Sequence, residues 1–410
     1  MINFLFYIIL LSSSLFSQSL VKTGIDVLIE KKFSLLEGKR IGLVTNPTGI
    51  TKDFRTTLDV LSKAKNIKLV AVFAPEHGVR GDIPAGEIVN SYIDSLTQLP
   101  VYSLYGKQKK PTSTMLKNID ALVYDIQDIG CRSYTYISTM ANIMEAAAEN
   151  NLECIILDRP NPLTGNLVEG NILEMQWKSF VGQFPIPYIY GMTCGELALM
   201  INEKGWLANG KKCSLKIMLM EGWKRSMWWE DTGLPWIPTS PHIPTSITAL
   251  YYPTTGILGE LQFVNIGVGY TLPFQLVGAT WLNTQQFADE LNSKKLDGVY
   301  FRPISYTPFY GSFKNQQLHG VQIHITNREK FSPIKTQLHI VQSLQKYFPE
   351  KNFWATIDSQ QIKMFDKVWG TSSVREQLLQ NISVDSIINS WQKRIINEFL
   401  VVRKKYLFYN

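Results

Sequence analysis

Four short apolar segments in the first half of the chain each run into polar residues. They are residues 40–46, 67–73, 119–126 and 152–157, and they are rich in Val, Ile and Leu. Continuous apolar runs of this length are typical of strands buried in a parallel sheet. Segments with apolar residues at helical spacing alternate with them, at 25–33, 54–64 and 136–148. This alternation predicts an α/β fold with a doubly wound, mostly parallel sheet.

The second part of the chain has a different pattern. Residues 263–269, 299–303 and 320–326 are expected to form strands, and 334–347 and 384–406 to form amphipathic helices. Five prolines lie between Pro235 and Pro253, which predicts a stiff, irregular connection. A chain of 410 residues is long enough for two domains. We therefore expect an N-terminal catalytic domain over 20–250 and a smaller α+β domain over 251–410 that closes a cleft.

Polar side chains follow four of the predicted parallel strands, at the point where each strand ends. Ligands of open α/β sheets bind outside these carboxyl ends, and neighbouring strands are about 4.8 Å apart. The residues concerned are therefore expected to face one small ligand, and they are Asn46, Glu76, His77, Asp125, Asp128, Asp158 and Arg159.

The sequence lacks the motifs that are typical of several kinds of cofactor and catalytic site. The turn 46–50 is neither a dinucleotide fingerprint nor a Walker loop, and the glycine-rich 266–269 lacks a third glycine. The sequence contains no Gly-x-Ser-x-Gly elbow. We therefore expect no nucleotide cofactor and no bound metal. A metal site on His77, Asp125 and Asp128 is the alternative.

Charge and the N-terminus bear on partners and location. The net charge of +7 is modest and spread out, which suits an anionic substrate or a cell-wall surface, and we expect no nucleic-acid partner. Residues 4–16 form an uncharged apolar run followed by small polar residues. This pattern predicts a signal peptide over 1–19 and export to the periplasm or medium, the alternative being a buried strand or membrane anchor. The four cysteines match no zinc motif and are expected to be buried free thiols.

Longer motifs resemble one known family. They are GLVTNPTGI, FAPEHGVRG, VYSLYG, YDIQDIGCRSYTYIST, LDRPNPLTGNLVEG, YGMTCGELA, LPWIPTSPHIPT, HGVQIHIT and SWQKRIINEFLVVRKKYLFY. Together they run from about Gly24 to the C-terminus. The chain is similar over this length to the exo-β-N-acetylmuramidase family (NamZ-like enzymes, glycoside hydrolase family 171, formerly a domain of unknown function).

The resemblance implies a Rossmann-like N-terminal domain, a smaller C-terminal domain and a site between them. It implies an exported enzyme that releases N-acetylmuramic acid from the non-reducing end of peptidoglycan fragments. The glutamate of the PEHG motif, the family's proposed catalytic residue, corresponds to Glu76.

Glycoside hydrolysis needs a proton donor and a group that stabilises or attacks the anomeric carbon. Glu76 is our candidate acid/base, with His77 supporting it. Asp125 or Asp128 is the candidate second carboxylate, and attack by the substrate's own 2-acetamido group is the alternative. The residues expected to bind substrate are Asn46, Arg80, Arg132, Tyr134, Asp158, Arg159, Asn161, Glu169 and His242.

The three arginines in this set are suited to a lactyl carboxylate, since a guanidinium group binds carboxylates in a bidentate manner. The alternative is that each arginine forms an ion pair with a neighbouring aspartate.

The chain departs from the family pattern in one segment expected to line the cleft. Where the family has EGTN followed by GRGT, residues 258–263 read LGELQF and 267–271 read GVGYT. The usual proline-serine-proline-asparagine run appears as Thr239-Ser240-Pro241-His242. These differences leave three alternatives open: a non-catalytic sugar-binding or scaffold protein, a glycosidase with altered sugar specificity and, without a supporting nucleophile or zinc motif, an amidase or esterase.

Overall fold

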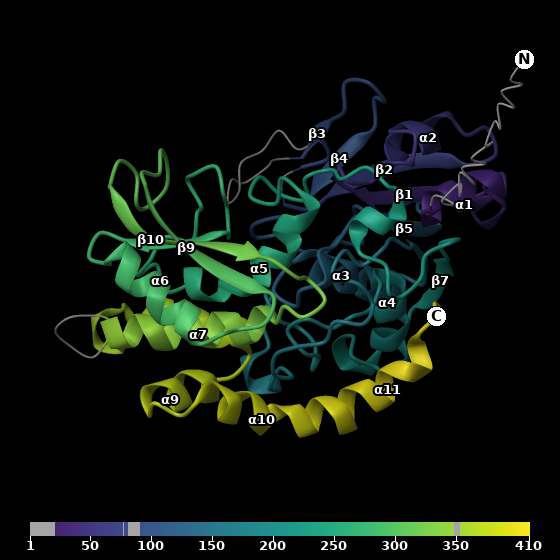
Figure 1. Ribbon diagram of the computed structural model, residues 1–410. Coiled ribbons are helices and arrows are strands. Elements are labelled where there is room, and N and C mark those ends of the chain that lie inside the picture. The colour runs from purple at the N-terminus through teal and green to yellow at the C-terminus, as the bar shows by residue number, and fades with distance from the viewer. Residues whose placement is uncertain (1–20, 77, 81–90, 348–352) are drawn as a thin grey trace, which may run out of the picture.

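The computed structural model describes residues 21–76, 78–80, 91–347 and 353–410. The predicted signal segment 1–19 and His77 lie outside these residues. Two sheets organise the described chain, a larger one in its N-terminal part and a smaller one in its C-terminal part (Figure 1). None of the described helices is both long enough and apolar enough to cross a bilayer.

The larger sheet has the strand order β3-β4-β2-β1-β5-β6-β7, and only the β3–β4 pair is antiparallel. The six parallel strands follow the Rossmann order, in which the winding direction reverses between β1 and β5. The predicted α/β fold is confirmed, and β1, β2, β5 and β6 are the four strands predicted from the apolar segments. The strands are β1 (Arg40–Thr45), β2 (Lys68–Ala74), β3 (Tyr92–Ile93), β4 (Pro100–Ser103), β5 (Ala121–Asp125), β6 (Glu153–Leu157) and β7 (Ser214–Met218).

Helices cover both faces of this sheet. Val44 and Tyr124 pack in the core under α3 and α4, whereas their neighbours Leu43 and Val123 pack in a second core under α1 and α2. Because both faces are buried, the strands are apolar throughout instead of alternating with polar residues. The helices are α1 (Gly24–Glu30), α2 (Thr57–Lys63), α3 (Tyr136–Glu149) and α4 (Cys194–Glu203).

Gly49 allows the chain to turn closely over the end of β5. A Cβ atom at this position would lie 2.0 Å from Thr45 Oγ1 and 2.9 Å from the Asp125 carbonyl oxygen. Only glycine fits at such distances. The turn after β1 is therefore held directly against β5, at the edge where the polar strand ends gather.

The smaller sheet is antiparallel, in the order β8-β10-β9, and α6 packs against β9 and β10 with α7 beside it (Figure 1). The predicted second domain with α+β character matches this arrangement. Its elements are α5 (Ser246–Gly259), β8 (Leu276–Ala279), α6 (Thr284–Ser293), β9 (Val299–Tyr306), β10 (Leu318–Ile325), α7 (Pro333–Tyr347), α8 (Ser359–Trp369), α9 (Ser373–Leu379), α10 (Val384–Arg394) and α11 (Val401–Arg403).

Two local predictions are wrong. Residues 263–269 form a loop with a single bridge, Asn265 to Gly278, because Asn265 Oδ1 accepts a bond from Gly267 N and Gly267 has a φ of 85°. The segment 235–253 is irregular only in its first part, since α5 begins at Ser246 and contains Pro253. Gln337 of α7 bonds to the Pro253 carbonyl and to Leu258 N, so a tertiary contact supports the helix despite its proline.

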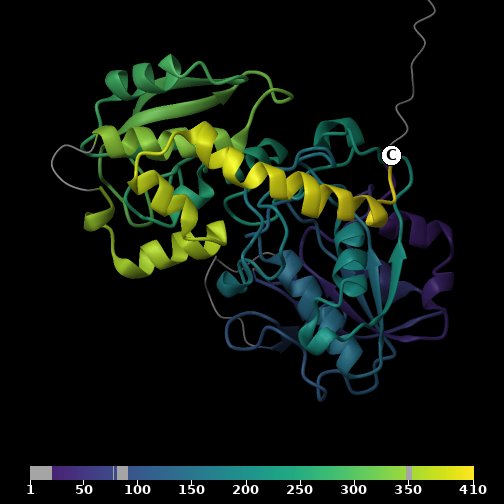
Figure 2. The same cartoon turned by 90° about the horizontal axis from the view of Figure 1, so that it is seen from below.

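The C-terminal segment returns to the larger sheet. Figure 2 shows the helical run from α10 to α11 crossing from the smaller domain to the N-terminal domain, and this run includes a π-helical turn at Ile395–Leu400. Beyond it, the Tyr409 hydroxyl donates to Asp158 Oδ2 at 2.6 Å. The last residues therefore bind the same sheet edge that carries the predicted site.

Candidate active site

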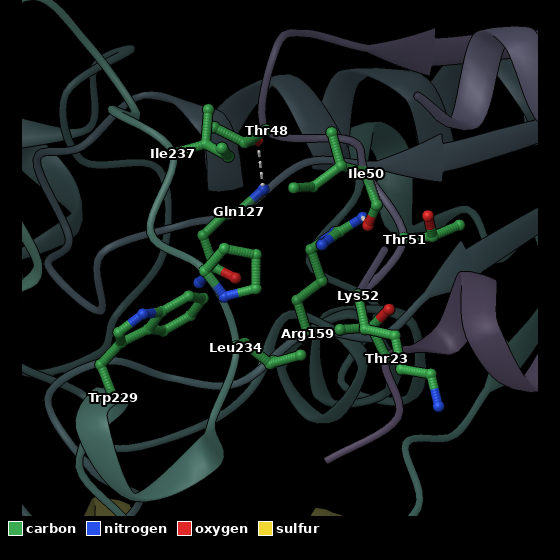
Figure 3. A pocket seen from close by; sticks show the side chains of 11 residues that line it. Thr23, Thr48, Ile50, Thr51, Lys52, Gln127, Arg159, Trp229, Leu234 and Ile237 are labelled. Carbon is green, nitrogen blue, oxygen red and sulfur yellow. Dashed lines mark hydrogen bonds between the residues drawn. The ribbon is translucent and has the colours of Figure 1, made fainter. Parts of the chain in front are cut away.

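A crevice lies above the ends of β1 and β5, where the strand order reverses (Figure 3). Thr48 Oγ1 accepts a hydrogen bond from Gln127 N across it at 2.9 Å. Trp229, Leu234 and Ile237 cover it and leave about 10 Å³ of free volume. That is space for about one water molecule, so a sugar does not fit in this crevice.

Asp125 and Arg159 form a buried ion pair beside the crevice. Arg159 Nε lies 2.5 Å from Asp125 Oδ1, and Arg159 Nη2 lies 2.8 Å from Oδ2. Thr57 Oγ1 also donates to Asp125, and Nη2 of the arginine donates to the Ile50 carbonyl at 2.8 Å. The pair thus joins the ends of β5 and β6 to the turn after β1. Both carboxylate oxygens of Asp125 are bonded to side chains of the protein, which indicates a structural role.

Asp158 is the acceptor of a complete hydrogen-bond network at the end of β6. Its carboxylate accepts from Gly195 N at 2.8 Å, Thr193 Oγ1 at 2.8 Å and the Tyr409 hydroxyl. Burial raises its pKa to about 6. Asp158 therefore connects the start of α4 and the C-terminus to the sheet.

Glu76 lies two residues beyond β2 and is half-buried. Pro75 ends the strand, and its carbonyl accepts a bond from Gly78 N at 3.2 Å, so the chain turns directly around Glu76. Burial raises the pKa of Tyr105, which follows β4, to about 12, and a hydrogen bond with Glu76 adds to the shift. The carboxylate therefore has a phenol partner from the neighbouring strand end.

Two further tyrosines lie close to Glu76 and to Asp128. Burial raises the pKa of Tyr134 and of Tyr136, and the charges of both carboxylates contribute to each shift. The hydroxyl of Tyr134 donates to Thr239 Oγ1 at 2.7 Å, and that of Tyr136 donates to the Thr239 carbonyl at 2.6 Å. The structure thus gathers two carboxylates and several phenols around one edge of the sheet.

Asp128 and Asn46 each have a buried polar atom, Asp128 Oδ1 and Asn46 Nδ2, that makes no well-formed hydrogen bond to any residue that the structure describes. The other oxygen of Asp128 accepts from the Tyr190 hydroxyl at 2.5 Å and from Gly130 N at 2.7 Å. Burial raises the Asp128 pKa to about 6. Asn46 Oδ1 accepts from Thr48, so its amide NH₂ faces the site near Tyr136. Unpartnered buried atoms of this kind are expected where a ligand supplies the missing bonds.

The three predicted arginines all bond within the protein. Arg80 binds Asp94 through Nε at 3.0 Å and Nη2 at 3.1 Å, and this contact holds the pKa of Asp94 at about 2. Arg159 binds Asp125. Arg132 is fully buried and donates to four backbone carbonyls that join the two domains, those of Asn171, Ile186, Val368 and Trp369. Ion pairing with an aspartate, the alternative interpretation, is therefore observed for Arg80 and Arg159.

The other predicted contact residues also have internal partners. Asn161 bonds to Leu163 N and to the Met192 carbonyl. Glu169 accepts from Ser332 Oγ and Ile334 N at the start of α7, and burial raises its pKa to about 7. His242 Nε2 lies 2.9 Å from the Tyr310 hydroxyl. Substrate contact stays a prediction for the whole set.

Tyr105, Tyr136 and Tyr190 were not predicted as site residues. Each lies within one of the family motifs, but a tyrosine carries no sequence pattern that separates a site residue from a core residue. Among the described residues, no group of three or more His, Cys, Asp or Glu side chains is arranged to hold a metal. The four cysteines are buried and free.

Comparisons with known proteins give one consistent family. The model of the N-terminal domain of exo-beta-N-acetylmuramidase NamZ matches residues 41–247, and that of the C-terminal domain matches residues 250–409. The peptidoglycan beta-N-acetylmuramidase NamZ of Bacillus subtilis (strain 168) is 45% identical over 389 residues, which cover 95% of this chain and 91% of that protein.

Solved structures agree with this assignment. One DUF1343 family protein from Bacteroides fragilis NCTC 9343 has a TM-score of 0.90 at 50% identity. A second from the same organism has a TM-score of 0.78 at 32% identity. Each comparison covers 95% of this chain and 99% of the other. The chain therefore belongs to the exo-β-N-acetylmuramidase NamZ family of glycoside hydrolases.

Proposed function

We propose that this protein is an exported enzyme that releases N-acetylmuramic acid from the non-reducing end of peptidoglycan fragments. The observation that carries the proposal is the group formed by Glu76, Tyr105 and Asp128 at the sheet edge. It offers two carboxylates in different surroundings, as glycoside hydrolysis requires. The activity named for the 45% identical Bacillus subtilis relative supports the same substrate.

In this proposal Glu76 donates a proton to the leaving oxygen and then accepts one from water. Tyr105 holds its carboxyl in place. Asp128 is the better of the two candidate second carboxylates, because Asp125 is bonded to Arg159 and Thr57 whereas one oxygen of Asp128 has no hydrogen bond from the described residues. A carboxyl group with a pKa of about 6 is mostly ionised at pH 7, and it then stabilises positive charge at the anomeric carbon or at an acetamido nucleophile.

The test of activity uses two substrates, an N-acetylmuramic acid glycoside with a chromogenic leaving group and the disaccharide N-acetylmuramic acid–β-1,4–N-acetylglucosamine. Purified protein is expected to release the chromophore from the first and free N-acetylmuramic acid from the second. Binding of either substrate without release would instead support a non-catalytic sugar-binding protein.

A second candidate function is a glycosidase for neutral hexosamines. The internal bonding of Arg80, Arg132 and Arg159 favours it, because these were the predicted partners of the lactyl carboxylate. The matched chromogenic N-acetylglucosaminide separates the two functions. The muramidase proposal requires a clear preference for the muramic acid substrate, and equal rates on both would favour the second function.

Export is tested by fractionating the native host and sequencing the mature N-terminus. A signal peptide over 1–19 predicts a mature chain that begins between Gln18 and Leu20. Recovery of intact Met1 from the cytoplasmic fraction would contradict export.

A further inference from the structure

A cavity of about 280 Å³ lies in the C-terminal domain, in the segment where the sequence departs from the family pattern. The end of α5, the loop after it and the loop between β9 and β10 form its walls. Gln262, Gly311 and Ser312 of its lining are exposed, so the cavity opens to solvent. Its volume is near the lower end of the range for small-molecule sites, about 300–1,000 Å³.

Packed aromatic rings close the inner side of the cavity. Phe274 lines it, and the Tyr252 ring packs against Phe274 with centroids 5.0 Å apart. Tyr252 in turn contacts Tyr134, with centroids 5.7 Å apart, and its hydroxyl lies 3.0 Å from Ser133 Oγ. These rings separate the cavity from the sheet edge that carries Glu76, so the cavity is a site of its own.

One carboxyl group in the cavity has no partner. Glu260 is the only acidic or basic residue among the described residues of the lining, and no hydrogen bond or ion pair to it is found in the described chain. The nearby Asn265 side chain is bonded within the protein, because it donates to the Val268 carbonyl and accepts from Gly267 N and the Tyr306 hydroxyl. Burial raises the pKa of Glu260 to about 7. A buried polar group without a partner is expected where a ligand supplies the missing bond.

Three features of this site favour a positively charged ligand. Glu260 carries a negative charge when it is ionised. It also follows the C-terminal end of α5, where the helix dipole stabilises positive charge. Phe274 and Phe313 line the cavity, and aromatic rings attract ammonium groups. A carboxylate ligand would instead lie beside Glu260 without any cation in the described lining to pair with it.

The lining also distinguishes an organic cation from a metal ion. Calcium takes about six to eight oxygen ligands, and magnesium requires octahedral coordination. Glu260 supplies the one carboxylate of the described lining, and Val264, Ile266, Phe274 and Phe313 make much of the rest apolar. An ammonium group can pair with a single carboxylate, and the carbon atoms of its ligand can pack on these apolar side chains.

We propose that this cavity binds a primary ammonium group, with Glu260 accepting a charge-assisted hydrogen bond from it and Phe274 and Phe313 packing against the carbon atoms of the ligand. The inference goes beyond the proposed function, because it involves neither Glu76 nor turnover. Two sources carry such a group on a small apolar frame. One is an amino sugar that lacks its acetyl group, and the other is the side chain of a diamino acid such as lysine.

The experiment is calorimetry on the full-length protein near neutral pH with two matched pairs of ligands. The first pair is glucosamine and N-acetylglucosamine, and the second is Nα-acetyl-lysinamide and its Nε-acetylated form. Acetylation removes the positive charge in each pair. The wild type is expected to bind at least one amine about tenfold to a hundredfold more tightly than its acetylated form, as for a charged hydrogen bond.

Glu260→Gln keeps the size of the side chain but not its charge, and it should bind the two members of each pair equally. Asp289→Asn, which neutralises an exposed carboxylate on α6, is the matched control and should keep the preference of the wild type. Thermal unfolding establishes that both variants are folded. Tighter binding of glucosamine than of the lysine derivative would assign the amino sugar as the source, and the reverse order would assign the amino acid.

Equal affinities for the amines and their acetylated forms in the wild type would overturn the proposal, as would the absence of binding by either amine. A preference for the amine that persists in Glu260→Gln would place the bound cation elsewhere and would also overturn it. A wild type that cleaves neither muramic acid substrate but binds an amine through Glu260 would contradict the proposed function and leave this inference standing.

Discussion

Asp125, Asp158 and Arg159 are fully bonded at the ends of β5 and β6, whereas at the same edge of the sheet Asp128 and Asn46 each have a buried polar atom that makes no well-formed hydrogen bond within the described chain. We call the first three the bonded region. The open region consists of Asn46, Glu76 and Asp128. Both regions lie at the same edge of the sheet and contain carboxylates, so position alone does not separate a structural carboxylate from a catalytic one.

The difference between the regions is the supply of partners. Asp125 and Asp158 receive bonds from Arg159, from α4 and from the C-terminal Tyr409. No such element covers the open region within the described chain, where tyrosines supply most of the contacts. A buried polar atom without a partner costs about 1–3 kcal/mol, so its presence is best explained by a ligand that completes the bonds. The comparison makes four predictions.

The largest expected effect comes from the open region. Glu76→Gln keeps the shape of the side chain but cannot transfer the catalytic proton, so kcat should fall by about 10²–10⁴-fold while the fold is retained. The measurement is release of N-acetylmuramic acid from the disaccharide, with circular dichroism to monitor folding. Glu37→Gln, an exposed change before β1 at the opposite edge of the sheet, is the control. Near wild-type turnover in Glu76→Gln would remove Glu76 from the chemistry.

Substitutions in the bonded region are expected to lower the free energy of unfolding. Arg159→Met leaves Asp125 buried and unpaired, which is expected to lower the free energy of unfolding by about 3–5 kcal/mol in urea denaturation. The double variant Asp125→Asn with Arg159→Met, which leaves no unpaired charge, should recover part of the loss. Unchanged stability in Arg159→Met with a large loss of activity would move this residue from the bonded to the open region.

The pH dependence of kcat/KM in Asp128→Asn tests the difference between the two regions further. Asp128 ionises around pH 6, so kcat/KM of the wild type should rise between about pH 5 and 7 if the ionised form is needed. The variant should lose this rise and about tenfold to a hundredfold in kcat/KM at pH 7. Asp158→Asn is the matched control, because Asp158 has a similar pKa but belongs to the bonded region. A rise around pH 6 that persists in Asp128→Asn would assign it to another group.

The smallest effect is expected at the domain contact made by Glu169. Burial raises its pKa from 4.5 to about 7, so the folded protein keeps a proton that the unfolded chain releases. Binding of this proton adds to the free energy of unfolding. The contribution is fully present below about pH 4.5 and is lost as the pH rises through about 7. In Glu169→Gln the melting temperature should therefore fall less between pH 5 and 8 than in the wild type, by a few °C. Parallel pH profiles for the two proteins would show that Glu169 does not titrate in this range.

Local patterns were sufficient for much of the larger domain. Strands β1, β2, β5 and β6 and helices α1 to α3 lie close to their predicted ranges, because continuous apolar runs and helical spacing reflect burial on two faces of one sheet. The same patterns placed Asn46, Glu76, Asp125, Asp128 and Asp158 at one edge. They failed at 263–269 and around Pro253, where an asparagine turn and a contact with Gln337 decide the backbone.

The sequence by itself therefore determined the fold class, the family and the edge of the sheet that carries the polar residues. Only the tertiary structure separated Asp128 from Asp125 and showed Arg80, Arg132 and Arg159 bonded to groups up to 237 residues away. The physical reason is that a side chain's role depends on which donors and acceptors fold against it, and these come from distant segments that leave no mark on the local sequence.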